Sequence, residues 1–218
     1  MMSEAKESQG TSPKFKLVIQ LIIGAFAGMV TSAGVLFWME GTIDTGLSLS
    51  NEIAAVVGAL YALIAVGVFI GAMSPALGER YLNVEDADEI RDQRTMLLFS
   101  VVAMATFGGA LILLAIAGPG GPISGEAALA TAVAFIAIGS WCGWKSYKAS
   151  DELMLAVNVE GSALSFMLMF LVLGGWAAAA HTGVSVAPAP IDLLTLFYVI
   201  SLLASFIAIG RRGMIVVR

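Results

Sequence analysis

The stretch MLLFSVVAMATFGGALILLAIA, residues Met96–Ala117, contains no Asp, Glu, Lys, Arg or His. A helix needs about 20 apolar residues to cross about 30 Å of hydrocarbon, and this stretch is long enough to do so. Its apolar residues do not alternate with polar ones, as they would in the strands of a membrane β-barrel. Because lipid satisfies no backbone N–H or C=O group, such a run predicts a transmembrane α-helix.

Five further stretches share this composition. The six expected spans are 17–39, 53–74, 96–117, 127–144, 162–180 and 193–210. The chain as a whole agrees, since 59% of its residues are apolar and 12% are charged, with a mean hydropathy of +0.92. Soluble domains are nearer half apolar and a quarter charged. We therefore expect an all-α polytopic membrane protein, with a six-helix domain over 14–212, a disordered tail over 1–13 and a second tail over 213–218.

The basic residues predict how these spans are oriented. With six spans, all 11 Lys and Arg residues fall on one side of the membrane, and the charged residues of the other side are all acidic. Loops on the cytoplasmic side have the excess of Lys and Arg, so both termini are expected in the cytoplasm. The first apolar run exceeds the about 7–15 residues of a signal-peptide core, so we interpret it as a retained helix.

Charged segments precede the third and fifth spans. Residues Glu85–Arg94 place acids before bases, which favours a helix. Residues Asp151–Glu160 contain no Gly or Pro. We expect both helices to begin in the cytoplasm, a turn or two before the membrane. Each segment has an Asp-Glu pair and leads into a hairpin with a Gly-Gly pair and a basic end, so these two hairpins are interpreted as tandem copies.

The segment DELMLAVNVEGSA, which starts at Asp151, resembles the start of small bacterial inner-membrane proteins of unknown function. Those proteins open with an Asp-Glu pair, run through a polar turn into a membrane hairpin, and end in two or three arginines. The match covers residues Asp151–Arg212, and this chain differs by having four further helices in front. The resemblance implies the bacterial inner membrane as the location, and it implies no activity.

Residues that perform chemistry are scarce. No ionisable residue lies inside the six spans, which argues against a proton-coupled transporter, a proton pump and a voltage sensor. One cysteine (Cys142) and one histidine (His181) are too few for a disulfide framework or a multi-ligand zinc site. The net charge of −5 leaves no basic surface for nucleic acid. We therefore expect no enzyme activity, no metal, no cofactor and no nucleic-acid partner.

Two sets of intramembrane residues remain as candidate sites. Tyr61 and Tyr198 are expected near mid-membrane, where each hydroxyl needs a partner, either across two helices or in a shared polar cavity. Glycines spaced by four form faces where helix backbones can approach closely, either inside the bundle or against a partner. These glycines are Gly24, Gly28, Gly67, Gly71, Gly139 and Gly143.

The sequence favours an accessory or scaffolding subunit in the lipid bilayer, bound to a protein partner or to a second copy of the chain. The longest cytoplasmic connection, Glu79–Arg94, is the most densely charged, so its residues Asp88, Glu89 and Asp92 are the predicted docking site. The alternative is a carrier or substrate-binding component for a neutral small solute or lipid. In that case Tyr61 and Tyr198 would contact the bound molecule.

Overall fold

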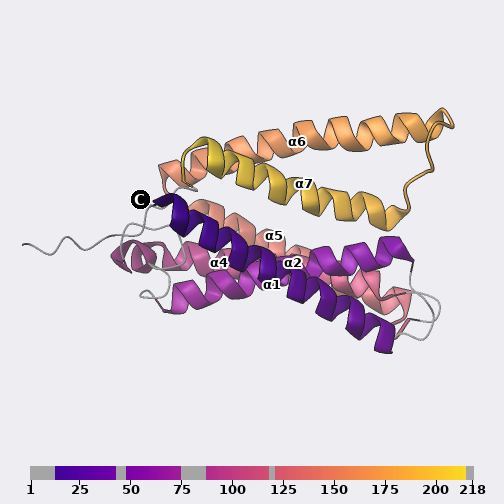
Figure 1. Ribbon diagram of the computed structural model, residues 1–218, viewed down its shortest axis with the longest axis horizontal. Helices are drawn as coiled ribbons and strands as arrows, with labels where there is room; N and C mark the ends of the chain where they lie inside the picture. The colour runs from indigo at the N-terminus through magenta and orange to yellow at the C-terminus, as the bar shows by residue number, and fades with distance from the viewer. Residues whose placement is uncertain (1–12, 43–47, 75–86, 118–120, 215–218) are drawn as a thin grey trace, which may run out of the picture.

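The computed structural model describes residues 13–42, 48–74, 87–117 and 121–214 (Figure 1). In these ranges the chain forms six α-helices and no strand, and each helix is long and apolar enough to cross a membrane. They are α1 (Pro13–Thr42), α2 (Leu49–Met73), α4 (Ala87–Ala115), α5 (Gly125–Ala149), α6 (Glu152–His181) and α7 (Pro190–Arg211). The predicted all-α membrane fold is therefore confirmed.

The helices extend beyond most of the expected spans. α4 begins at Ala87 and α6 at Glu152, so the charged segments before the third and fifth spans are helical, as predicted. With 30 residues, α6 is about 45 Å long and exceeds a hydrocarbon core of about 30 Å. α4 ends earlier than expected, at Ala115, and Ala117 instead pairs with Ile123 in an isolated bridge that closes the turn to α5.

Short polar residues set the helix starts. Ser48, Ser124 and Asp151 each accept a hydrogen bond from a backbone N–H three residues further on. At the start of α7 the side chain reaches back instead: the Asp192 carboxylate accepts a hydrogen bond from the backbone N–H of Ala189, three residues earlier, at 2.8 Å. These contacts satisfy amide groups that have no partner within the first turn of a helix.

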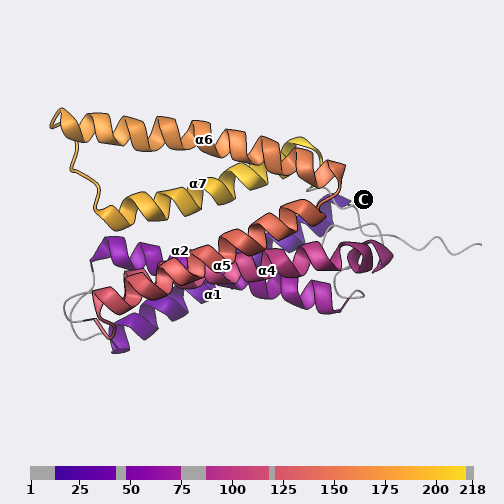
Figure 2. The same ribbon diagram turned by 180° about the vertical axis from the view of Figure 1, so that it is seen from behind.

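The helices are arranged as a bundle and a hairpin (Figure 1). α4 packs against α2 and α5, and α1 packs against α2, which makes a four-helix bundle. α6 and α7 form the hairpin, which joins the bundle where α7 packs against α2 and, less extensively, α4. Among the described helices, α6 packs extensively only against α7, and Figure 2 shows the hairpin lying along one side of the bundle.

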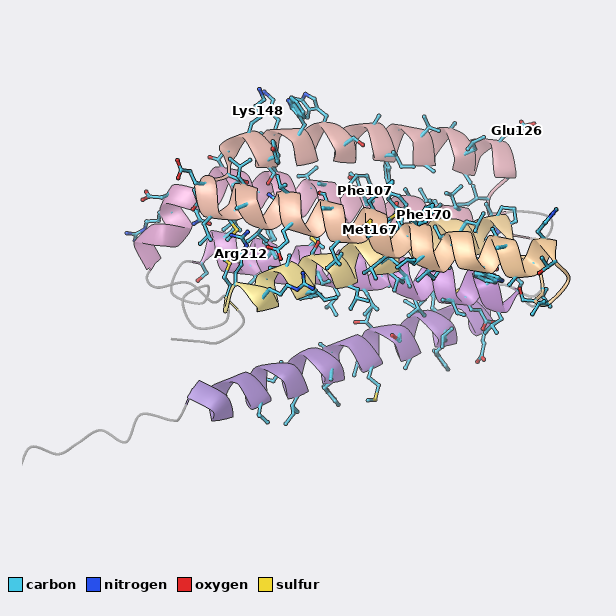
Figure 3. The ribbon with its side chains drawn as sticks, turned by 90° about the horizontal axis from the view of Figure 1, so that it is seen from above. Phe107, Glu126, Lys148, Met167, Phe170 and Arg212 are labelled. Carbon is cyan, nitrogen blue, oxygen red and sulfur yellow. The ribbon has the colours of Figure 1, made fainter. Side chains whose placement is uncertain are left out.

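The core lies where α2, α4 and α7 meet. Its buried residues are mostly small or aromatic: Met39, Ala54, Ala55, Tyr61, Leu111, Ala115, Ile116 and Tyr198. From the described part of α1, Met39 is buried in this cluster and Val35 packs against it, whereas the helix diverges from the others toward its N-terminal end (Figure 3). Small side chains at the contacts allow helix backbones to approach closely, as is usual in membranes.

The predicted glycine faces are only partly used inside the bundle. Gly71 is buried, and Gly28 and Gly139 lie against side chains of neighbouring helices. A Cβ atom would meet open space at the other three: Gly24, Gly67 and Gly143. In each pair spaced by four, only one of the two glycines is therefore buried or lies against a neighbouring helix.

A close contact between α2 and α4 uses two glycines that the four-residue spacing did not select. A Cβ on Gly58 would lie 2.7 Å from the carbonyl oxygen of Gly108, and a Cβ on Gly108 would lie 2.5 Å from that of Gly58. The two backbones therefore touch directly, and α2 and α4 require glycine at both positions. The spacing pattern missed them because each helix contributes a single glycine to the contact.

The two ends of the molecule differ in charge. Lys148 lies over the ring of Trp144 on α5, with its Nζ 5.1 Å from the ring centre, and a second Lys–Trp pair lies one turn earlier. Figure 3 shows Lys148 and Arg212 at one end and Glu126 at the other. Indole rings favour the membrane surface, so the Trp–Lys pairs fit the headgroup level at the basic end.

Candidate membrane-embedded binding site

Tyr61 on α2 and Tyr198 on α7 lie in contact, with their ring centres 5.1 Å apart in an edge-on arrangement. The Tyr61 hydroxyl donates to the backbone carbonyl oxygen of Tyr198 at 2.9 Å. The Tyr198 hydroxyl donates in turn to the backbone carbonyl oxygen of Phe107 on α4, at 3.1 Å. Both tyrosines are buried. The structure thus brings the predicted pair together, and the hydrogen bonds join three helices.

The hydrogen bonds define what the tyrosines can still do. A phenol has one proton to donate, and both protons are used on backbone carbonyl groups. Each phenolic oxygen keeps its acceptor capacity, so it can receive a hydrogen bond from a bound hydroxyl or amide. The pair therefore joins α2, α4 and α7, and neither hydroxyl has a proton left to donate to a bound molecule.

A cavity of about 320 Å³ lies beside the tyrosines, and we refer to it as the tyrosine cavity. Its lining comes from α2, α4, α5 and α7: Tyr61, Phe107, Ile136, Leu194, Phe197, Tyr198 and Ser201. None of these side chains is charged, and most of them are apolar. Sites for small molecules are typically hollows of about 300–1,000 Å³ with mainly apolar walls and a few polar groups, and this cavity fits that description.

A second hollow, of about 460 Å³, lies between α6 and α7, and we refer to it as the hairpin groove. It is lined by Met154, Val157, Asn158, Gly161, Ser162, Ser165, Phe166, Met169, Phe197, Ser201, Ser205 and Ile209. Phe197 and Ser201 line both the groove and the tyrosine cavity, so the two hollows adjoin along α7. The groove was not predicted from the sequence, because its serines lie on two helices and only the pairing of α6 with α7 brings them together.

Hydroxyl groups join the two helices of the hairpin beside this groove. The hydroxyl oxygens of Ser165 and Ser201 lie 3.3 Å apart across α6 and α7. The Ser205 hydroxyl donates within α7, to the backbone carbonyl oxygen of Ser201 at 2.8 Å. A contact such as Ser165–Ser201 is worth about 1 kcal/mol or less between membrane helices, so it aligns the hairpin without locking it.

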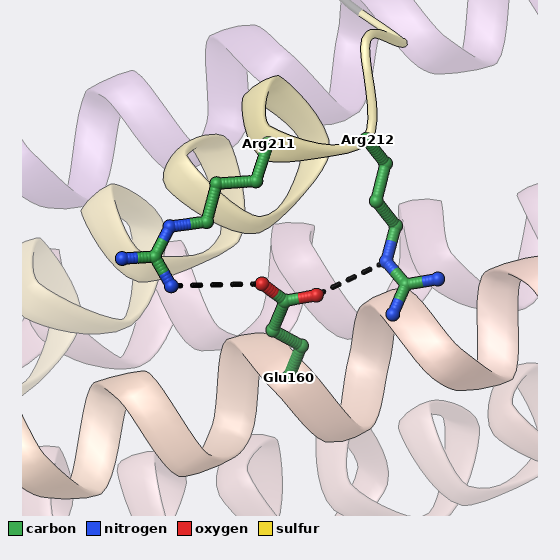
Figure 4. Close-up of polar contacts among 3 residues, drawn as sticks. All are labelled: Glu160, Arg211 and Arg212. Carbon is green, nitrogen blue, oxygen red and sulfur yellow. Dashed lines mark hydrogen bonds and ion pairs between the residues drawn. The ribbon is translucent and has the colours of Figure 1, made fainter.

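An ion-pair cluster closes the end of the hairpin where α6 begins and α7 ends (Figure 4). The Nε of Arg212 donates to Glu160 at 3.0 Å, and Nη1 of Arg211 lies 3.7 Å from the other carboxylate oxygen. All three side chains are partly exposed. This cluster was not predicted from the sequence. The predicted hairpin could have indicated it, because two antiparallel helices bring residues near 160 and 211 to the same level.

The other predicted residues lie away from these hollows. The side chains of Asp88 and Glu89 lie outside the described part of the structure, and Asp92 is exposed on α4. Cys142 is a free, buried thiol on α5, and His181 is exposed in the last turn of α6. Among the residues that the structure describes, no group of three or more His, Cys, Asp or Glu could hold a metal ion.

Comparisons with protein-family models, with curated proteins and with solved structures find no significant match for this chain. The resemblance of residues Asp151–Arg212 to small bacterial inner-membrane proteins stays a prediction. Function is therefore inferred from the chemistry of the site itself.

Proposed function

We propose that the chain is a membrane-embedded binding component or carrier for a neutral, lipid-like molecule. The observation that supports this most is the tyrosine cavity, a hollow between four helices that has uncharged walls and a few polar groups. The lining residue Ile136 is 37% exposed, so the hollow is not sealed from the surroundings of the bundle. A molecule dissolved in the bilayer is the natural ligand for such a site.

Recognition at this site would depend mainly on shape. Lipid tails are as apolar as the cavity walls, so moving an apolar molecule from the bilayer into the cavity gains little hydrophobic free energy. Tyr61, Tyr198 and Ser201 bear the hydroxyl groups of the lining, but apolar atoms form almost all of its surface. A neutral, largely apolar ligand group fits these walls, whereas a charged ligand would lack a counter-charge.

The accessory function predicted from the sequence is the second candidate. Its support is that Asp92 is exposed on α4, near the end of the molecule where that helix begins. Exchange of Asp88, Glu89 and Asp92 for lysine is expected to release a protein partner that co-purifies with the wild type. Unchanged recovery of the partner would contradict docking at this segment.

We further propose that the protein lies in a bacterial inner membrane with both termini in the cytoplasm. The location is supported by the resemblance of the last hairpin to small bacterial inner-membrane proteins. The orientation is supported by the 11 Lys and Arg residues. With six spans, all of them fall on the same side of the membrane as the two ends of the sequence.

The binding function can be tested with two matched tryptophan variants. Ile136 lines the tyrosine cavity, whereas Ile138, two residues further along α5, is 47% exposed and is not part of the lining. We expect wild-type protein and Ile138→Trp, extracted gently from the native membrane, to retain a defined lipid-like molecule in near-stoichiometric amount. Ile136→Trp should retain at least about tenfold less, equivalent to a loss of about 1.4 kcal/mol.

Mass spectrometry of the extracted material measures this retention. Each variant must elute as a single species of wild-type helicity, so that a loss of ligand is not a loss of fold. Retention of equal amounts by all three proteins would contradict binding in the cavity. A stoichiometric protein partner without any small molecule would instead favour the accessory function.

A further inference from the structure

We propose that the ligand is a neutral glycerolipid with a free hydroxyl headgroup, such as a diacylglycerol. Its headgroup would occupy the hairpin groove and one acyl chain would occupy the tyrosine cavity. This inference rests on the proposed function and adds the class of ligand, its orientation and a second subsite.

The two hollows form one path along α7. Leu194, Phe197, Ser201, Ser205 and Ile209 line it, and they are spaced by three or four residues, so they share one face of the helix. The groove begins near the end of the hairpin, at Ile209, and the tyrosine cavity continues it to Leu194. A ligand that enters the groove can therefore extend into the cavity without crossing a helix.

The polarity of this path changes along its length. The groove contains the polar residues Asn158, Ser162, Ser165 and Ser205, whereas the lining of the cavity beyond Ser201 is apolar or aromatic. Asn158 precedes the expected membrane span, in the part of α6 that extends past the hydrocarbon core. A lipid in a bilayer has the same orientation, with its polar headgroup at the surface and its acyl chain toward the middle.

Two polar side chains of the groove are available to a ligand. Within the described part of the structure, Asn158 and Ser162 make no side-chain hydrogen bond or ion pair, and both are exposed. A side-chain amide offers two donors and an acceptor, and a hydroxyl offers a donor and an acceptor. Together they match the hydroxyl and ester oxygens of a glycerolipid headgroup.

The charges of the hairpin favour an uncharged headgroup. Among the residues that the structure describes, no charged side chain lines the groove or the cavity. Glu160 is two residues from Asn158, so it lies on the opposite side of α6. Its carboxylate and the guanidinium groups of Arg211 and Arg212 pair with one another (Figure 4). A phosphate group in the groove would have no basic partner, whereas membrane sites for anionic lipids contain Lys or Arg.

The test compares two lipids that share their acyl chains and differ in the headgroup. Native mass spectrometry of the full-length protein measures binding of a diacylglycerol and of the matching phosphatidylglycerol. We expect the wild type to bind the diacylglycerol at least about tenfold more tightly. The variant Asn158→Leu/Ser162→Ala should lose most of this preference. Val159→Ala, which changes an exposed residue outside the groove lining and alters no charge, should keep it.

Each outcome separates this inference from the proposed function. Equal binding of both lipids by the wild type, or an unchanged preference in Asn158→Leu/Ser162→Ala, would overturn the headgroup assignment. If Ile136→Trp still loses the ligand in that case, the cavity and the proposed function stand. If the wild type binds neither lipid and Ile136→Trp has no effect on retention, both fail. Should the double variant not fold, the single variant Ser162→Leu provides the same comparison.

Discussion

Tyr198 connects α7 to the bundle through both its backbone and its side chain. Its carbonyl oxygen accepts the Tyr61 hydroxyl, and its own hydroxyl donates to the carbonyl oxygen of Phe107. Its ring also meets the rings of Tyr61 and Phe107 edge-on, with centre distances of 5.1 and 6.3 Å. In the sequence this residue is one aromatic side chain in an apolar run, and nothing local indicates that three helices converge on it.

Removal of either hydroxyl is expected to lower stability by about 1 kcal/mol, which corresponds to about 2–4 °C in the thermal midpoint. The losses of Tyr61→Phe and Tyr198→Phe should add within about 0.5 kcal/mol. Additivity is expected because Tyr61 bonds the backbone of residue 198, which Tyr198→Phe leaves intact. Thermal unfolding in detergent measures this, with Tyr147→Phe, an exposed tyrosine, as the control that should not change.

A strongly non-additive pair would mean that the Tyr61 bond depends on the Tyr198 hydroxyl. A shift with Tyr147→Phe as large as those of the buried tyrosines would mean that the assay reports changes in detergent binding.

The glycine contact between α2 and α4 gives a second prediction for a single residue. Gly108→Ala would place a methyl group 2.5 Å from the carbonyl oxygen of Gly58, so the helices must separate. Overpacking of this kind costs about 1–3 kcal/mol, and we expect the thermal midpoint to fall by several degrees. The matched control is Gly67→Ala on α2, where a Cβ meets open space and alanine favours the helix. A fall with Gly67→Ala equal to that of Gly108→Ala would contradict the tight contact.

At the scale of elements, the hairpin is held by weak polar contacts. The Ser165–Ser201 contact lies deep in the hairpin, and the Glu160 cluster lies at its end. Both supplement the packing of small residues such as Gly161 against α7. Within the described part of the hairpin, the polar contacts between α6 and α7 are therefore weak ones, which suits a groove between them that admits a ligand.

Glu160→Gln is expected to lower stability by less than about 1 kcal/mol, because partly exposed ion pairs are weak and screened by salt. The change in thermal midpoint should be smaller than that of Gly108→Ala, and it should shrink further in high salt. Measurement of the midpoint at low and high ionic strength checks this. A fall of many degrees that persists in high salt would show that the cluster is more strongly coupled to the fold than its exposure indicates.

The apolar runs predicted every helix, but they did not predict all of the helix ends. α6 begins at Glu152 because Asp151 caps it and the charged turn continues the helix out of the membrane. A hydropathy pattern marks the part of a helix that lies in lipid, whereas capping and charge order set where the helix starts.

At the scale of the whole molecule, the sequence did not predict which helices pack together. In a soluble protein the apolar face of a helix marks its buried side. Here both the lipid-facing and the buried faces are apolar, so that signal is absent. The structure buries small residues such as Ala204 and Ala208, and it exposes large ones such as Phe166 and Phe170. Tyr61 and Tyr198 were selected because a buried hydroxyl needs a partner, but the cavity and the groove depend on packing and could not be derived.

The proposed orientation gives a prediction for the molecule as a whole. Ser185 is exposed in the connection between α6 and α7, and Asp92 is exposed near the opposite end. A membrane-impermeant maleimide should label Ser185→Cys in intact cells and should label Asp92→Cys only after permeabilisation. The native Cys142 is buried and gives a low background. Labelling of Asp92→Cys in intact cells, with protection of Ser185→Cys, would reverse the orientation.

The attachment of the hairpin through α7 has a consequence for biosynthesis. The chain leaves the ribosome from its N-terminus, so α2, α4 and α5 can pack together before the last helix exists. α6 has little to pack against until α7 follows it. Tyr198 arrives with this final helix, and its two hydrogen bonds reach back to helices that are already in place. The α7 part of the cavity lining, and the contacts of α7 with α2 and α4, therefore form only after α7 has been inserted.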